Sequence, residues 1–166
     1  IELKDNIENI YKPKKSLFEN NNNYKDIINE RCNPKQPDDF GGVSQALTIK
    51  KSIELKEEYE KENNFEYDIV ILYRYDVLLW KDIVLDDYKL DSNNIYVNAH
   101  EKSYGDFHFI MCNNNSLGFK NIFDSPLKNN NPHKRHRWIK HYITNIYCKK
   151  LIMDKIIPGK HQQVIR

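Results

Sequence analysis

Apolar and polar residues alternate along the chain in short blocks, and the sharpest block lies near the middle. Ile69 to Leu72 is an uninterrupted apolar run with polar boundaries, and apolar residues resume at Val77. A short β-branched run of this kind is typical of a strand that is buried on both faces in an α/β sheet. We therefore expect a central strand that begins at Tyr67 and whose apolar run ends at Arg74 and Asp76. The apolar residues from Val77 to Trp80 either continue this strand or begin a short turn, and the rest of the chain is organised around the stretch from Tyr67 to Leu79.

Helical periodicity marks two segments of the N-terminal half. Residues 1–11 carry an apolar stripe that stops at Lys12-Pro13, because proline disfavours helical geometry in the residue before it. Residues 43–63 form the first long helix, since the apolar side chains as far as Ile53 fall within one broad arc. The charged run 56–61 then predicts a solvated face that i, i+4 ion pairs stabilise.

The clearest helical signal lies in the C-terminal half and begins at Asn131-Pro132. Asparagine is a good N-cap, and proline is preorganised for the first helical turn. Apolar and aromatic residues then recur in adjacent pairs, four residues apart, from Trp138 to Tyr147. A shorter helix is expected at residues 24–31.

Strands and loops fill the remaining chain. Short apolar runs predict strands, which occupy residues 16–19, 95–97, 107–112, 151–157 and 164–165. The last two are expected to return to the sheet edge. Polar segments and asparagine clusters predict surface loops, because asparagine tolerates turn geometry; these occupy residues 20–23, 86–94, 98–105, 113–115 and 129–131. Together the elements predict a single α/β domain over residues 1–166.

Composition narrows the class of protein. The chain of 166 residues has a formal net charge of +2, so no global field selects nucleic acid or a membrane surface as a partner. Three cysteines without a Cys-x-x-Cys pair argue against a disulfide framework and favour a reducing, cytoplasmic compartment. No apolar run approaches 18 residues, which predicts a soluble protein without a membrane segment. The opening at Ile1 indicates an excised domain or a processed fragment.

The polar residues that end the central apolar run are the first candidates for chemistry. Ligand sites in open α/β sheets lie just beyond the carboxyl ends of strands, where Arg74 and Asp76 stand. Arg74 can contact a phosphate with two hydrogen bonds. Asp76 can hold Mn²⁺ or Mg²⁺, hard cations that a diphosphate itself coordinates in large part. An Arg–Asp ion pair on the surface explains the same spacing, and spacing alone favours that explanation.

Asp106 is the second candidate. It precedes a predicted strand, where a carboxylate can act as general base on an acceptor hydroxyl or stabilise positive charge that develops on the donor sugar. A turn aspartate that caps a loop is the alternative. The basic cluster from His133 to His141 has no i, i+4 histidine pair and no acidic partner, which favours a solvated helical turn over a phosphate or nucleic-acid site. His100 and His161 are isolated. The sequence contains no GxGxxG, Walker, GxSxG or HExxH motif.

Several short segments share their order with one known group of proteins. They are Tyr11-Lys12-Pro13-Lys14, Lys50-Lys51 with Tyr59-Glu60, Tyr67-Asp68 with Arg74 and Asp76, Gly105-Asp106-Phe107, and the helix from His133 to His141. They resemble the segments YKPK, KK-YE, YD-V---R-D, D-F-IG and H---KKH of small GT-A-like glycosyltransferases, in which R-x-D replaces the usual DxD. The similarity runs from Tyr11 to His141.

The resemblance implies a GT-A-like α/β sandwich, a mixed sheet flanked by helices that binds a nucleotide-sugar donor. It implies that Gln45, Arg74 and Asp76 bind the donor, with Asp76 at the Mn²⁺ or Mg²⁺ ion, and that Asp106 serves catalysis on the acceptor side. The group's opening strand, which precedes YKPK and holds the base, has no counterpart in the residues before Tyr11.

We therefore expect a glycosyltransferase that uses a nucleoside diphosphate sugar, most often a UDP-sugar, with a glycan or glycoprotein as acceptor. The alternative is a non-catalytic glycan- or protein-binding module that keeps the fold. Neither hypothesis predicts a nucleic-acid partner.

Overall fold

The computed structural model describes residues 2–32, 39–74, 77–79, 81–100, 103–125, 139–158 and 162–164. The α-helices are α1 (Glu2–Tyr11), α2 (Lys25–Arg31), α3 (Asp39–Asn63) and α4 (Asn113–Phe119). The 3₁₀ turns are η1 (Asn21–Tyr24), η2 (Leu85–Asp87) and η3 (Lys120–Ile122), and η4 (Tyr142–Ile146) is π-helical. The strands are β1 (Ile69–Tyr73), β2 (Val77–Leu79), β3 (Asn94–His100), β4 (Ser103–Cys112), β5 (Lys150–Pro158) and β6 (Gln162–Val164).

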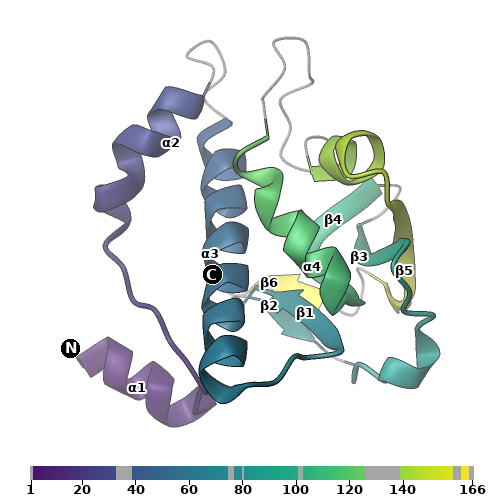
Figure 1. Ribbon diagram of the computed structural model, residues 1–166, viewed down its shortest axis with the longest axis horizontal. Helices are drawn as coiled ribbons and strands as arrows, with labels where there is room; N and C mark the ends of the chain where they lie inside the picture. The colour runs from purple at the N-terminus through teal and green to yellow at the C-terminus, as the bar shows by residue number, and fades with distance from the viewer. Residues whose placement is uncertain are drawn as a thin grey trace.

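Four strands form one mixed sheet in the order β1-β4-β3-β5. β4 runs antiparallel to both β1 and β3, whereas β5 runs parallel to β3. β2 and β6 pair separately as a small antiparallel sheet. In Figure 1, α3 stands between the four-stranded sheet on one side and α1 and α2 on the other. The described chain is thus α/β, with a small mixed sheet flanked by helices, as the sequence predicts at this level.

β1 lies at the edge of the sheet, which corrects the expectation of a central strand. Its residues alternate in burial, since Val70 is 7% exposed whereas Ile71 and Tyr73 are each 39% exposed. The expected burial on both faces is therefore wrong. A run of β-branched residues is compatible with a covered strand and with a half-covered edge strand, because β-propensity depends on the surroundings of each face.

The hydrophobic core lies between one face of the sheet and the helices. α3 contributes the arc that its periodicity predicts, and these residues are Val43, Ala46, Ile49 and Ile53. The sheet and the later helical segments supply the other side of the core, with Val70, Ile95, Val97, Phe109, Met111, Phe119, Ile139, Ile143 and Leu151. The rings of Phe109 and Phe119 meet edge to face, with centroids 5.0 Å apart.

α3 differs from the expected helix at both ends. It begins at Asp39, so Gly41-Gly42 lies inside the helix instead of before it. Near its other end, Lys56 Nζ lies 2.9 Å from Glu60 Oε2, which confirms an i, i+4 ion pair in the charged run. Glu60 is only 6% exposed, however, so the prediction of a solvated face is wrong at this position. The beginnings of α4 and β1 pack there and cover it.

Several predicted loops belong to regular elements. β3 and β4 extend through most of the segment 98–105, and the 113–115 asparagine cluster begins α4 with Asn113 and Asn115 buried. Conversely, residues 16–19 form no strand. They run as irregular chain toward η1, and the Glu19 carboxylate lies 2.6 Å from Lys51 Nζ on α3.

The ends of the chain agree better with the predictions. α1 ends before Lys12, whose backbone is left-handed with φ 45°, and α2 matches the short predicted helix. β5 returns to the sheet edge as expected, whereas β6 pairs with β2. The predicted helix start at Asn131-Pro132 lies outside the described residues, which resume at Ile139 in a helical turn before η4. Among the described helices, none has the length and apolar character needed to cross a bilayer.

Candidate active site

Arg74 lies where the sequence predicts it, directly after the last residue of β1. The chain turns there, and the Val77 backbone N–H donates to the Arg74 carbonyl at 3.2 Å. The Tyr73 hydroxyl donates to the Val77 carbonyl and closes the same turn. The Arg74 side chain is half-buried. Asp76, the predicted metal and diphosphate ligand, lies outside the described residues, so its role stays a prediction.

Asp106 lies inside β4, so its predicted position in front of the strand is wrong. Tyr73, the last residue of β1, is paired with His108, which is two residues further along β4. The backbone of Asp106 therefore lies near the carboxyl end of β1, although β4 itself continues to Ser103 in its pairing with β3. The Asp106 side chain lies outside the described part of the structure, so its catalytic role stays a prediction. Gln45, the third donor-side prediction, is half-buried in the N-terminal part of α3. Gln45 lies on a helix, so the strand pairing gives no information on its distance from Arg74. The donor role of Gln45 therefore stays a prediction.

A buried cluster of three side chains, Tyr88, His108 and Asp154, lies next to this end of the sheet. His108 Nε2 is 3.0 Å from Asp154 Oδ2, and the Tyr88 hydroxyl donates to the same oxygen at 2.8 Å. An ionised carboxylate only accepts hydrogen bonds, so the ring proton of His108 belongs on Nε2. Burial, together with the hydrogen bond to Asp154, raises the pKa of the Tyr88 phenol far above its ordinary value. We call these residues the buried cluster.

Asn98 and Gly105 join the buried cluster to an irregularity in the sheet. The pairing of β3 shifts register next to Asn98 on both of its sides, toward β4 and toward β5. At this bulge, Asn98 Oδ1 accepts a hydrogen bond of 3.4 Å from the backbone N–H of His108. A side chain at residue 105 would overlap the Asn98 amide. Gly105 therefore allows the Asn98 side chain to approach β4 closely.

A second polar group lies at the opposite, amino end of β1. Glu60 Oε1 accepts from the Tyr67 backbone N–H at 2.8 Å and from the Asn113 amide at 3.4 Å. Burial alone raises the pKa of the Glu60 carboxyl, but the Tyr67 N–H, the Lys56 ammonium and the Asn113 amide outweigh it and hold that pKa below its ordinary value. Glu60, the last residue of the KK-YE segment, thus stabilises the fold.

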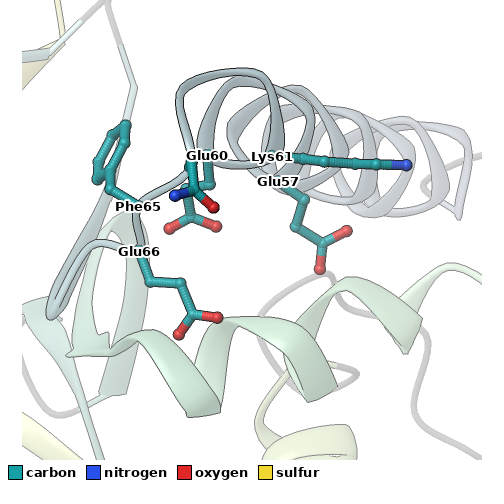
Figure 2. A pocket seen from close by; sticks show the side chains of 6 residues that line it. Glu57, Glu60, Lys61, Phe65 and Glu66 are labelled. Atoms are coloured by element: carbon teal, nitrogen blue, oxygen red, sulfur yellow. The ribbon is translucent and has the colours of Figure 1, made fainter.

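An open pocket of about 500 Å³ lies beside Glu60, at the end of α3. Figure 2 shows side chains from the last turns of α3 and from the following chain around it. The lining residues are Glu57, Glu60, Lys61, Asn64, Phe65 and Glu66. Glu57 is paired with Lys120 at 2.7 Å, and Glu60 with Lys56, so its acidic lining is partly neutralised. The pocket is at the wrong end of β1 for the predicted diphosphate site.

Within the described part of the chain, no three His, Cys, Asp or Glu side chains gather as a metal site requires. Asp76 lies outside that part. Of the C-terminal histidine cluster, His141 is described, and its Nδ1 lies 2.9 Å from the Asn145 amide nitrogen. His133 and His136, as well as His161, lie outside the described residues. Cys32, Cys112 and Cys148, all in the described part of the chain, form no disulfide.

Comparisons with protein-family models, with curated proteins and with solved structures find no match for this chain. The glycosyltransferase resemblance therefore stays a prediction from short sequence segments, and the described fold establishes the α/β class alone.

Proposed function

We propose that the chain is a glycosyltransferase that transfers a sugar from a nucleoside diphosphate donor, most often a UDP-sugar, to a glycan or glycoprotein acceptor. One observation supports this most strongly: Arg74 stands at the carboxyl end of β1, and the register of β1 and β4 places the backbone of Asp106 near that end. The proposed positions for the leaving diphosphate and for the acceptor thus lie near one strand end, where ligand sites of α/β sheets are common.

The proposed reaction is a displacement at the anomeric carbon. The acceptor hydroxyl forms a bond to that carbon, the bond to the diphosphate oxygen breaks, and its electron pair leaves with UDP. Asp106 takes the hydroxyl proton as general base. Arg74 makes charge-assisted hydrogen bonds to the diphosphate and offsets the charge that develops on it. Gln45 completes the donor side.

Mn²⁺ or Mg²⁺ is the proposed cofactor, with Asp76 as its protein ligand. Hard cations accept this arrangement, because phosphate oxygens and water supply most of the coordination. When bound, the ion supplies positive charge that stabilises the leaving diphosphate. Arg74 provides the same kind of stabilisation from the protein itself, so donor binding is expected to depend on Arg74 even where the ion contributes little.

Titration calorimetry with UDP, with and without Mn²⁺, tests donor binding. We expect wild type to bind UDP and Arg74→Gln to bind roughly tenfold more weakly or worse, because a charged contact to phosphate is lost. Asp76→Ala should remove the dependence on Mn²⁺. Lys89→Gln, which removes an exposed cation elsewhere, is the matched control and should bind as wild type does. Absence of UDP binding under both conditions would overturn the proposal.

The role of Asp106 requires a separate measurement. We expect Asp106→Asn to lower the turnover of UDP-sugar hydrolysis, in which water replaces the acceptor, by roughly 10²–10⁴-fold. The affinity for UDP should stay within about twofold, because Asp106 is on the acceptor side. A panel of UDP-glucose, UDP-galactose and UDP-N-acetylglucosamine supplies the donor. Equal losses of UDP affinity and turnover would place Asp106 with the donor instead.

A non-catalytic binding module is the second candidate, and one surface feature favours it. Phe65 and Tyr67 in the segment before β1, and Ile71 and Tyr73 in β1, are each 38–39% exposed. Exposed apolar and aromatic side chains on and beside an edge strand are a usual docking surface for a glycan or a peptide. This candidate predicts glycan binding that neither Mn²⁺ nor Asp76→Ala alters, measured on a glycan array with both proteins.

A further inference from the structure

The buried cluster is an expensive feature in terms of stability. His108 and Asp154 side chains are 0% exposed, and Tyr88 is 7% exposed. The free-energy cost of removing a carboxylate and its partner from water offsets much of their electrostatic attraction. Well-packed apolar residues therefore often stabilise a core as well or better. Buried polar contacts of this kind have one advantage over apolar packing, which is that they are satisfied only in one geometry.

The position of the buried cluster indicates which geometry it holds. His108 is paired with Tyr73, the residue before Arg74. Along β4, His108 is two residues from Asp106. At the level of the backbone, the buried cluster thus lies close to both positions that the proposed reaction requires.

The bulge in β3 explains why the pairing of β3 with β4 around Asn98 needs additional contacts. Around Asn98 the backbone register shifts toward both neighbouring strands, so the regular ladder is interrupted. β-Bulges interrupt pairing and redirect side chains, and they are frequent beside active sites. Here side chains replace the lost backbone contacts, since Asn98 Oδ1 accepts from the His108 N–H and Asp154 accepts from the His108 ring.

We propose that His108 is a positioning residue of the proposed active site, held by Asp154 and Tyr88 so that β4 keeps Asp106 aligned with the Arg74 end of β1. This inference rests on the proposed function for its catalytic consequence. His108 does not touch substrate in this arrangement, because its side chain is fully buried. Its effect is on the alignment of the acceptor-side carboxylate and not on donor affinity.

Two tyrosine variants provide the sharpest test. Tyr88→Phe removes the hydroxyl that binds Asp154, and Tyr142→Phe removes a buried hydroxyl that donates to the Gly118 carbonyl at 2.7 Å, far along the chain from Asp106. Both variants lose one phenol hydrogen bond, so similar losses of stability are expected. We expect only Tyr88→Phe to lower the turnover of UDP-sugar hydrolysis, by roughly tenfold, with UDP affinity unchanged.

His108 itself gives the second test. His108→Leu should lower turnover more than Tyr88→Phe does, and His108→Gln, whose amide can donate to Asp154, should restore part of it. Where His108→Leu does not fold, the tyrosine pair decides alone. Equal turnover in Tyr88→Phe and Tyr142→Phe, or a loss confined to UDP affinity, would overturn the positioning role.

Hydrogen exchange separates this inference from the proposed function. Amides of residues 103–107 should exchange faster in Tyr88→Phe than in Tyr142→Phe, since these residues of β4 lie beside the disturbed contacts. If wild type binds no UDP, the proposed function fails, and the exchange measurement still reports on positioning. Identical exchange of these amides in the two variants would overturn the inference even in an active enzyme.

Discussion

Glu60 shows how one buried carboxylate can join α3, the segment that leads into β1, and α4. It accepts from Lys56, the Tyr67 N–H and the Asn113 amide. We expect Glu60→Gln to lower the free energy of unfolding by about 1–3 kcal/mol, because charge-assisted hydrogen bonds are lost around a side chain that is only 6% exposed. Urea unfolding measures this. Glu54→Gln, at an exposed position of the same helix, should change it by less than about 0.5 kcal/mol; equal losses would contradict the explanation.

Single residues were also the hardest to predict from the sequence, because burial depends on partners far along the chain. Glu60 stands in a charged run that has the composition of a solvated face, and only the packing of α4 against α3 buries it. His108 stands alone in an apolar strand, whereas Asp154 is followed by Lys155 in another. An ionisable residue within an apolar strand is a signal of a buried polar partner, but the partner follows only from the order of the strands.

Two glycines give a test at the scale of elements. A Cβ at Gly105 of β4 would overlap the Asn98 amide, and a Cβ at Gly118 of α4 would overlap the Tyr147 ring. Asn98 is 0% exposed and has no room to move, whereas the half-buried Tyr147 ring can turn toward solvent. We expect Gly105→Ala to lower the free energy of unfolding by about 1–3 kcal/mol.

For Gly118→Ala, the better helix propensity of alanine, worth about 1 kcal/mol, should offset most of the displacement of Tyr147. Thermal unfolding of the two variants, followed by circular dichroism, gives the comparison. A larger loss of thermal stability in Gly118→Ala than in Gly105→Ala would contradict this expectation. It would show that α4 packs against Tyr147 more tightly than β4 packs against Asn98.

Element boundaries and types followed from local patterns where one face was clearly apolar. α1 and α2 form where their periodicity predicts helices, and α3 buries the arc that its periodicity predicts. The apolar stripe predicted for α1 is not buried, since Ile10 and Tyr11 are 73% and 66% exposed. β1 shows the limit of this reasoning. Its residues have strand propensity, but whether it lies at the centre or the edge is decided by β4, which pairs with it from more than thirty residues away. Local sequence carries no information on that pairing.

At the scale of the whole molecule, the sequence predicted the α/β class and the end of the strand at which Arg74 stands, both of which the structure shows. The GT-A assignment, the ion at Asp76 and the donor role of Gln45 depend on a resemblance between short segments. Asp106 was predicted from the residues beside it, and only the register of β1 and β4 shows that its backbone lies near the carboxyl end of β1. Arg74 and Asp106 are connected through the pairing of β1 with β4. A change that weakens this pairing is therefore expected to lower the proposed activity as well.

The pH dependence of stability tests how the molecule as a whole uses its partly buried carboxylates. The pKa of Glu60 lies below its ordinary value of 4.5, and hydrogen bonds from Lys51 and Tyr24 lower the pKa of Glu19 in the same direction. A carboxyl with a lower pKa in the folded state stabilises the protein above its unfolded pKa, and this contribution is lost as pH falls through the folded pKa. We therefore expect the urea concentration at the unfolding midpoint of wild type to decrease as the pH is lowered from about 5 to about 3. The difference between wild type and Glu60→Gln should be largest near neutral pH and should vanish in acid, where the protonated Glu60 resembles glutamine. A difference that stayed constant down to pH 3 would show that Glu60 stabilises the fold through its shape and not through its charge.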